Sequence, residues 1–126
     1  MNIGEIVNIG VDCIELDRFK MVNRENIKKK IFTENEDKYC SNMANPNQHY
    51  AGKFTCKEAV IKAFSYWNIS LKPRDIEVLN DEEGRPYVIL HKDLKKDYII
   101  KTSISHSNTM AIAYVLVILD DMENSE

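Results

Sequence analysis

The chain has 126 residues, of which 44% are hydrophobic and 29% are charged, and its formal net charge is −3. This length fits one domain with one core, and the composition is that of a globular chain rather than a disordered one. The slight negative charge argues against a general nucleic-acid binder.

The first part of the chain predicts a strand followed by a helix. Residues 6–11 are rich in β-branched side chains and end at Gly10 and Asp12, which is typical of a buried strand. Residues 13–22 carry apolar side chains at helical spacing, and residues 24–32 continue as a looser, basic helix.

A capping box predicts where the next helix begins. Thr33 and Glu36 have the T-x-x-E spacing in which each side chain accepts a hydrogen bond from the other residue's backbone N–H. This helix should begin near Glu34 and run to about Met43, where the sequence NPNQ breaks it. A further helix is expected over residues 48–67.

The rest of the chain predicts strands. Residues 74–90 contain two strands around an acidic turn that ends in glycine, which indicates a hairpin. Residues 98–107 alternate in polarity, and the apolar run 110–119 reads as a last, buried strand. One strand, three helices and four strands predict an α+β fold with a mainly antiparallel sheet, in a single domain over residues 1–126.

Cysteine usage and hydropathy suggest the compartment. The three cysteines have no metal-type spacing, and the N-terminus lacks the basic start and apolar stretch of a secretion signal. The run 110–119 is shorter than the about 20 residues that a membrane helix needs. We therefore expect a cytoplasmic protein in a reducing environment, without a membrane span.

The segment 54–67 predicts a helix with an unusual polar stripe. Its core face, at 100° per residue, is formed by Cys56, Ala59, Val60, Ala63 and Trp67. Glu58 and Lys62 lie one turn apart on the other side, yet Phe54 and Ile61 flank them closely. A simple ion pair worth about 0.3–0.5 kcal/mol would explain the stripe. The alternatives are a ligand cleft or a flank that a second protein surface covers.

A functional reading of Glu58 needs a second acid, and Asp12 is the natural candidate. A hard divalent cation prefers carboxylate oxygens and often takes its other ligands from water and substrate phosphates. Asp12 follows a buried strand, so it either binds a ligand or caps the next helix. His106 ends a predicted strand and is either a turn residue or part of a site.

Three blocks of the sequence, taken together with their order and spacing, indicate a family. They are IGVDCIELDR (9–18), FTCKEAVIKAF (54–64) and SISHS (103–107). In order and spacing they resemble the acyl carrier protein synthase type of 4′-phosphopantetheinyl transferase, over nearly the whole chain. The resemblance implies that family's fold. It also implies magnesium-dependent transfer of 4′-phosphopantetheine from coenzyme A to a serine of an apo acyl carrier protein, for fatty acid biosynthesis.

The resemblance also assigns roles to individual residues. It implies that Asp12 and Glu58 hold Mg²⁺ against the diphosphate of coenzyme A, and that Lys62 completes the catalytic set by stabilising the leaving phosphate. It implies that further residues bind coenzyme A, namely Lys53, Lys57, His106 and Ser107.

The same family suggests two protein contacts. Its members dock acidic carrier proteins on the helix after G-x-D, which here would present Arg18, Met21, Arg24 and Lys28 on one side. Its members are homotrimers with active sites between subunits, so a neighbour would cover the flank beside Glu58. One departure is the segment 65–74, which lacks the family's glycine-rich turn and is expected to alter the fit of pantetheine.

Two other functions remain open at this stage. The glycine-free segment 65–74 would suit a degenerate module that binds coenzyme A or a carrier protein without turnover. Two carboxylates and a lysine would also suit a magnesium-dependent phosphate-ester hydrolase, although no further acid for a two-metal site stands out. Retention of Asp12, Glu58, Lys62 and His106 favours the active transferase.

Overall fold

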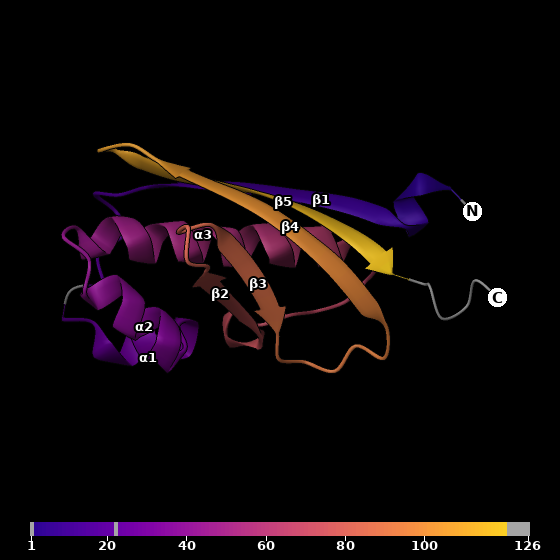
Figure 1. Cartoon of the computed structure of the whole chain (residues 1–126), viewed down its shortest axis with the longest axis horizontal. Helices are drawn as coiled ribbons and strands as arrows, with labels where there is room; N and C mark the ends of the chain where they lie inside the picture. Colours follow the sequence, from indigo (N-terminus) through magenta and orange to yellow (C-terminus); the bar gives the residue numbers. More distant parts are fainter. Residues whose placement is uncertain (1, 22, 121–126) are drawn as a thin grey trace.

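A long helix, α3, forms the centre of the protein and lies under a three-stranded antiparallel sheet (Figure 1). The computed structural model describes residues 2–21 and 23–120. In chain order its elements are η1 (Ile3–Glu5), β1 (Val7–Glu15), α1 (Glu25–Ile31), α2 (Glu34–Ser41), α3 (Pro46–Ser65), η2 (Pro73–Asp75), β2 (Ile76–Asn80), β3 (Pro86–Leu90), β4 (Asp97–His106) and β5 (Met110–Asp120). The predicted α+β class is confirmed, and the strands form two antiparallel sheets.

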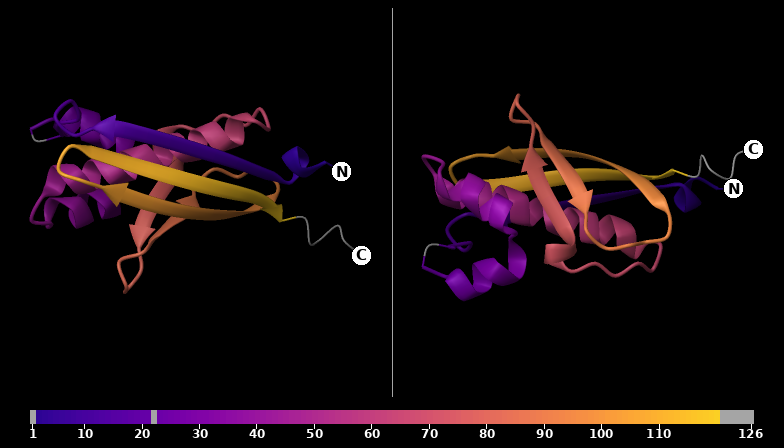
Figure 2. Two further views of the ribbon diagram at one scale, coloured as in Figure 1. Left: turned by 90° about the horizontal axis from the view of Figure 1, so that it is seen from above. Right: turned by 60° about the horizontal axis from the view of Figure 1, so that its bottom comes forward.

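The larger sheet has the order β1–β5–β4, with β5 paired to both neighbours (Figure 2). Because side chains alternate between the faces of a strand, every second residue of β5 points toward α3. These residues are small or β-branched and buried, namely Ala111, Ala113, Val115 and Val117. The second sheet pairs β2 with β3 on the other side of α3 (Figure 1).

The helix α3 is therefore buried on two sides by the chain itself. Its predicted core face is confirmed for Cys56, Ala59, Val60 and Ala63, which have no exposed surface and share one core cluster with Phe64. Trp67, also predicted for this face, lies beyond the end of the helix at Ser65 and is partly buried against the same cluster. A second cluster lies toward α1 and α2 and comprises Leu16, Phe19, Met21, Phe32, Cys40, Tyr50, Ala51 and Ala111. Within the described part of the chain, no helix is both long and apolar enough to cross a membrane.

The helix predicted over residues 13–22 is wrong. Strand β1 continues through Glu15, because the long strand β5 offers pairing partners as far as Met110. A short turn follows, and α1 begins only at Glu25. Leu16 and Phe19, two of the apolar residues that suggested a helix, are buried, but they enter the second core cluster from an irregular segment. The third, Val22, lies outside the described residues.

The other helix boundaries follow local signals. The capping box is confirmed, since Thr33 Oγ1 accepts from the backbone N–H of Glu36 and Glu36 Oε1 accepts from that of Thr33. Helix α3 begins at Pro46 rather than at residue 48, because proline suits a first helical position whose N–H needs no partner. The predicted hairpin is confirmed, with Gly84 at φ +83° in its turn.

The glycine-free segment after α3 is closed by an asparagine. Asn68 has φ +59°, the left-handed conformation that helix ends usually assign to glycine. The Ile69 N–H bonds the Phe64 carbonyl at 3.2 Å, and the Asn68 N–H bonds the Ser65 carbonyl at 3.0 Å. This is the Schellman pattern, and Ile69 packs against the core cluster that contains Phe64. Asn68 thus supplies the backbone conformation that a glycine would otherwise provide.

Substitution of Asn68 tests this account of the helix end. We expect Asn68→Ala to lower the free energy of unfolding by about 1 kcal/mol, because alanine lacks the short polar side chain whose local hydrogen bonding lets asparagine tolerate the left-handed region. Asn68→Gly should stay within about 0.5 kcal/mol of wild type, because glycine adopts that conformation freely. Urea unfolding measures both. Equal stability of the alanine and glycine variants would contradict the assignment.

Candidate active site

Two carboxylates meet where strand β1 crosses helix α3. A Cβ placed on Gly10 would lie only 1.9 Å from the carbonyl oxygen of Ala59, so strand and helix touch at a point where only hydrogen fits. Asp12 lies two residues further along β1 and points to the same face as Gly10. Glu58 is the neighbour of Ala59. Gly10 therefore serves close packing, which brings the two acids together.

The charges of this pair act on each other. Burial raises the pKa of Glu58, the nearby carboxylate of Asp12 raises it further, and Lys62 lowers it. Lys62 Nζ lies 3.1 Å from Asp12 Oδ1 and 3.1 Å from the carbonyl oxygen of Val11. Lys62 thus links helix α3 to strand β1 through Asp12. An ion pair between Glu58 and Lys62 along the helix does not by itself explain the polar stripe.

This donor set fits a hard divalent cation such as Mg²⁺. Asp12 lies inside a strand, opposite Ala113, so it does not cap a helix. Asp12 and Glu58 are both half-buried acids with mutual repulsion, which a cation would relieve. No cluster of three or more His, Cys, Asp or Glu able to hold a metal occurs in residues 2–21 and 23–120. The remaining ligands would be water and substrate phosphates, as magnesium prefers.

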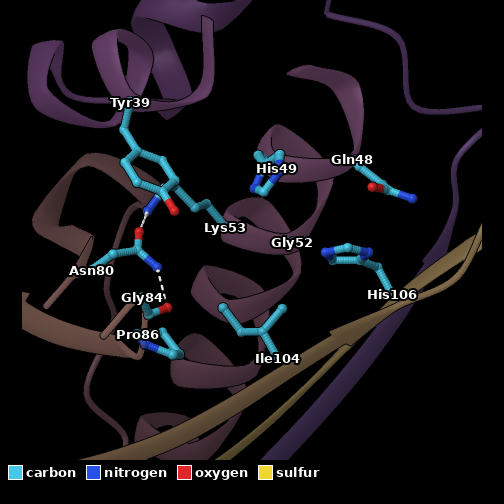
Figure 3. Close-up of a pocket in the computed structure, with 10 residues that line it drawn as sticks. All are labelled: Tyr39, Gln48, His49, Gly52, Lys53, Asn80, Gly84, Pro86, Ile104 and His106. Carbon is cyan, nitrogen blue, oxygen red and sulfur yellow. Dashed lines mark hydrogen bonds between the residues drawn. The ribbon is translucent and has the colours of Figure 1, made fainter. Parts of the chain in front are cut away.

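A pocket of about 130 Å³ lies on another face of α3 (Figure 3). It is lined by Tyr39, Gln48, His49, Gly52, Lys53, Asn80, Gly84, Pro86, Ile104 and His106. The rings of His49 and His106 meet edge to face, with centroids 5.7 Å apart. Burial lowers the pKa of His49, and His106 and Lys53 lower it further. The pocket therefore offers two imidazole rings whose N–H groups can donate hydrogen bonds to a ligand.

The pocket and the carboxylate pair lie at opposite edges of the sheet. Asp12 pairs with Ala113 on the central strand, and Ala113 pairs with Ile104 on β4. Neighbouring strands are about 4.8 Å apart, so about 10 Å of sheet separates Asp12 from the pocket residue Ile104. Figure 2 shows β1 and β4 on either side of β5. Within one chain, strand β5 and helix α3 stand between the two features.

Comparison with known proteins shows the family of the chain. The sequence profile of the 4′-phosphopantetheinyl transferase superfamily (ACPS) matches residues 8–115. The chain belongs to the 4′-phosphopantetheinyl transferase superfamily. The holo-[acyl-carrier-protein] synthase of Clostridium tetani is 40% identical over 120 residues, which cover 89% of this chain and 95% of that protein. That of Fusobacterium nucleatum is 36% identical over 121 residues, with 90% and 99% covered.

Solved structures of this superfamily share the fold. A holo-(acyl-carrier-protein) synthase from Bacillus anthracis in complex with CoA (3′,5′-ADP) has a TM-score of 0.75 and 34% identity, covering 91% of this chain and 98% of that one. The Helicobacter pylori holo-[acyl-carrier-protein] synthase in complex with coenzyme A has a TM-score of 0.71 and 27% identity, with 89% and 99% covered.

The residues expected to bind coenzyme A in this superfamily member fall into different environments. His106 lines the pocket. Ser107 lies just beyond, where its Oγ accepts from the backbone N–H groups of Thr109 and Met110 at 3.2 Å, and its carbonyl accepts from Gln48. Lys53 lines the pocket, but its side chain is buried and hydrogen-bonded within the protein.

The prediction that Lys57 contacts coenzyme A is corrected. Its side chain has no exposed surface, and its Nζ lies 2.8 Å from Glu36 Oε1. It also donates to backbone carbonyls, namely those of Ile31, Pro73 and Ile76. Burial lowers the pKa of Lys57, and Glu36 acts in the opposite direction. Lys57 is therefore part of the transferase scaffold.

Buried ions close the free edge of strand β2. Lys57 bonds the Ile76 carbonyl, Glu36 Oε2 accepts from the Val78 N–H at 2.7 Å, and Lys53 bonds the Val78 carbonyl at 2.6 Å. These side chains take the place of a neighbouring strand. Sequence reasoning found Glu36 only as a capping residue, because nothing local indicates that it also reaches β2.

The predicted carrier-docking set is also changed. Because residues 16–18 form a turn, the four residues do not share one helical side. Met21 is buried in the second core cluster. The side chain of Lys28 is 13% exposed and pairs with Glu25 and Asp37. Arg18 and Arg24 remain exposed.

The flank beside Glu58 is covered by the chain itself. Phe54 packs against Phe19, with ring centroids 5.0 Å apart, and Ile61 packs against the first core cluster. The inference that this helix needs a neighbouring subunit to cover its apolar flank is therefore wrong. Glu58 and Lys62 themselves lie on the least buried line of α3.

Proposed function

We propose that the protein transfers the 4′-phosphopantetheine group from coenzyme A to a serine of an apo acyl carrier protein, as a holo-[acyl-carrier-protein] synthase. The other product is adenosine 3′,5′-bisphosphate, and the modified carrier serves fatty acid biosynthesis. The observation that carries this proposal is the meeting of Asp12, Glu58 and Lys62 at the contact of β1 with α3. We propose the cytoplasm as the compartment of this reaction, because three free cysteine thiols suit a reducing environment.

The chemistry explains why these residue types are needed. The serine oxygen bonds to the pantetheine-side phosphorus of coenzyme A while the bond from that phosphorus to the bridging oxygen breaks. The bridging oxygen departs on adenosine 3′,5′-bisphosphate, and the serine proton is released to solvent. Phosphoryl transfer depends mainly on positioning and on neutralising negative charge. When bound by Asp12 and Glu58, Mg²⁺ would neutralise charge on the diphosphate. Lys62, which is more than half exposed beside Asp12, would donate to the departing phosphate.

The pocket lined by His49 and His106 is proposed to take the phosphate-bearing nucleotide end of coenzyme A. The imidazole rings of His49 and His106 can donate N–H hydrogen bonds there, as phosphate oxygens require. Strand β5 and helix α3 separate this pocket from the carboxylates of the same chain. A complete site is therefore proposed to join the carboxylates of one subunit to the pocket of a neighbour.

A site shared between two subunits requires an oligomer. We propose a homotrimer whose subunit boundary lies on the outer face of the larger sheet. That face points away from α3 and exposes large apolar side chains, namely Ile9, Val11, Ile99, Met110, Ile112 and Tyr114. An apolar patch of this kind usually marks an interaction surface. Closed cyclic symmetry then gives three equivalent sites.

Sedimentation equilibrium of the wild-type protein is expected to give about three times the chain mass. Tyr114→Asp should shift the population toward monomer and lower turnover with it, because a buried unpaired charge is costly. Tyr66→Asp is the matched control, since Tyr66 is exposed outside the sheet. A wild-type monomer with full specific activity at high dilution would contradict the trimer.

Carrier docking is proposed on the exposed residues around the start of α1. Arg18 and Arg24 are exposed, and although Arg18 Nε lies 3.5 Å from Glu15 Oε2, both guanidinium groups can reach an acidic partner. Ile27 is 40% exposed and, with Arg24 and Asn26, helps to line a shallow hollow. Ile27 therefore takes the apolar role that the sequence had assigned to Met21.

Arg24→Glu should raise the KM for the carrier protein by about five- to tenfold at low salt while leaving the KM for coenzyme A unchanged. The effect should shrink as ionic strength rises, because salt screens surface charges beyond about 10 Å. Lys38→Glu, on the exposed side of α2, is the control of equal charge change. Equal effects of Arg24→Glu on both KM values would contradict the proposal that the carrier protein docks here.

The proposed activity is tested by incubation with apo carrier protein, coenzyme A and magnesium, followed by intact-mass analysis. A phosphopantetheine adduct on the carrier is the expected result. Tight binding of coenzyme A or carrier without an adduct would indicate the degenerate binding module. Consumption of coenzyme A without an adduct would indicate the hydrolase.

A further inference from the structure

Lys53 stands in the wall of the pocket with its hydrogen-bonding capacity already used. Its side chain is 4% exposed, and its Nζ donates to the Val78 carbonyl at 2.6 Å and to Asn80 Oδ1 at 2.6 Å. The ammonium also lies 4.6 Å from the centroid of the Tyr39 ring. An ammonium has three protons, so two strong bonds and a ring face leave little for a ligand.

The partner Asn80 passes this contact on to the hairpin turn. Its Nδ2 donates to the Gly84 carbonyl at 3.0 Å (Figure 3). Since an ammonium only donates, Asn80 must present its oxygen to Lys53 and its NH₂ group to Gly84. Lys53 therefore fixes the orientation of the Asn80 amide.

The turn that Asn80 holds forms one wall of the pocket. Gly84 and Pro86 line the pocket together with Asn80. The turn has its own closure, because Asp81 accepts from the backbone N–H groups of Glu83 and Arg85 at 2.9 Å. Those bonds set the shape of the turn, whereas the bond from Asn80 ties it to α3 through Lys53.

We propose that Lys53 is a positioning residue, which acts through Asn80 and Gly84 to hold the hairpin turn as the wall of the nucleotide pocket. It does not bind a substrate phosphate directly. This assignment rests on the proposed function for the identity of the ligand. The relay from α3 to the turn rests on the contacts of Lys53, Asn80 and Gly84 alone.

A double-mutant cycle separates the relay from a direct contact. Lys53→Met and Asn80→Ala should each raise the KM for coenzyme A by about fivefold, with kcat and the KM for the carrier protein unchanged. The double variant should be no worse than either single variant, because both break one relay. If the increases in KM of the two single variants multiply in the double variant, Lys53 and Asn80 contact the ligand independently and the proposal is overturned. An unchanged KM in Lys53→Met would also overturn it.

A second measurement does not depend on turnover. Calorimetric binding of adenosine 3′,5′-bisphosphate should weaken to the same extent in all three variants, even if the wild type forms no carrier adduct. Amide hydrogen exchange of the turn 81–86 in ligand-free protein should accelerate in Lys53→Met and in Asn80→Ala. Unchanged exchange in that turn would overturn the relay. If Lys53→Met does not fold, Asn80→Ala alone keeps this test valid, because its Lys53 is intact.

Discussion

Replacing Glu58 by glutamine is expected to lower turnover by about 10²- to 10³-fold while the protein remains folded. The substitution keeps the shape of the side chain and removes one negative oxygen from the proposed magnesium site. Loss of one group that stabilises transition-state charge has effects of this size. The free energy of unfolding should change little or rise, because Glu58→Gln removes both the burial of a charge and the repulsion by Asp12, which together raise the pKa of Glu58.

The measurement is the rate of carrier modification as a function of magnesium concentration. Asp12→Asn should behave as Glu58→Gln does, and both should need more magnesium than wild type to reach half of their own maximal rate. Glu34→Gln is a control, because it removes a carboxylate from the exposed start of α2. Near-normal activity of Glu58→Gln at limiting magnesium would contradict the metal assignment.

Signals carried by adjacent residues were readable from the sequence. The capping box of Thr33 and Glu36 depends on residues three apart, and it fixed the start of α2 correctly. The hairpin of β2 and β3 likewise depends on a short turn with glycine in it. The blocks around Asp12 and Glu58 predicted that these acids belong together, and the packing of Gly10 on α3 brings them there.

Signals decided by distant residues were not readable. Residues 13–15 extend β1 because β5, about a hundred residues later, pairs with them. The apolar spacing of Leu16 and Phe19 fits a helix as well as a turn that enters the core. Propensity is a weak guide where tertiary pairing competes with it.

The burial of lysines on α3 also depends on residues far away in the chain, so it could not be predicted from the local sequence. Lys57 and Lys62 both occur in the family block, yet one has no exposed surface and the other is more than half exposed. Their positions differ by five residues, so they lie on different sides of the helix. The strand β2, which receives the ammonium of Lys57, follows about twenty residues later in the chain. A motif alone therefore cannot separate a scaffold lysine from one at the reaction centre.

Lys57→Met is expected to lower the free energy of unfolding by about 3–5 kcal/mol, the usual effect of removing one partner from a buried ion pair. Glu36 would keep its buried charge without the ammonium 2.8 Å away. The carbonyls of Ile31, Pro73 and Ile76 would lose a donor at the same time. Since domains of this size are stable by about 5–15 kcal/mol, urea unfolding should show a large shift of the midpoint.

Lys62→Met is the matched control for this experiment, because it removes the same charged group from the same helix. Lys62 is more than half exposed, so its loss should change the free energy of unfolding by no more than about 1 kcal/mol while lowering turnover. Lys57→Met, assayed where it is still folded, should keep most of its affinity for coenzyme A. If Lys57→Met unfolds like wild type and loses affinity for coenzyme A instead, Lys57 contacts the substrate after all, and the buried pair with Glu36 does not stabilise the fold.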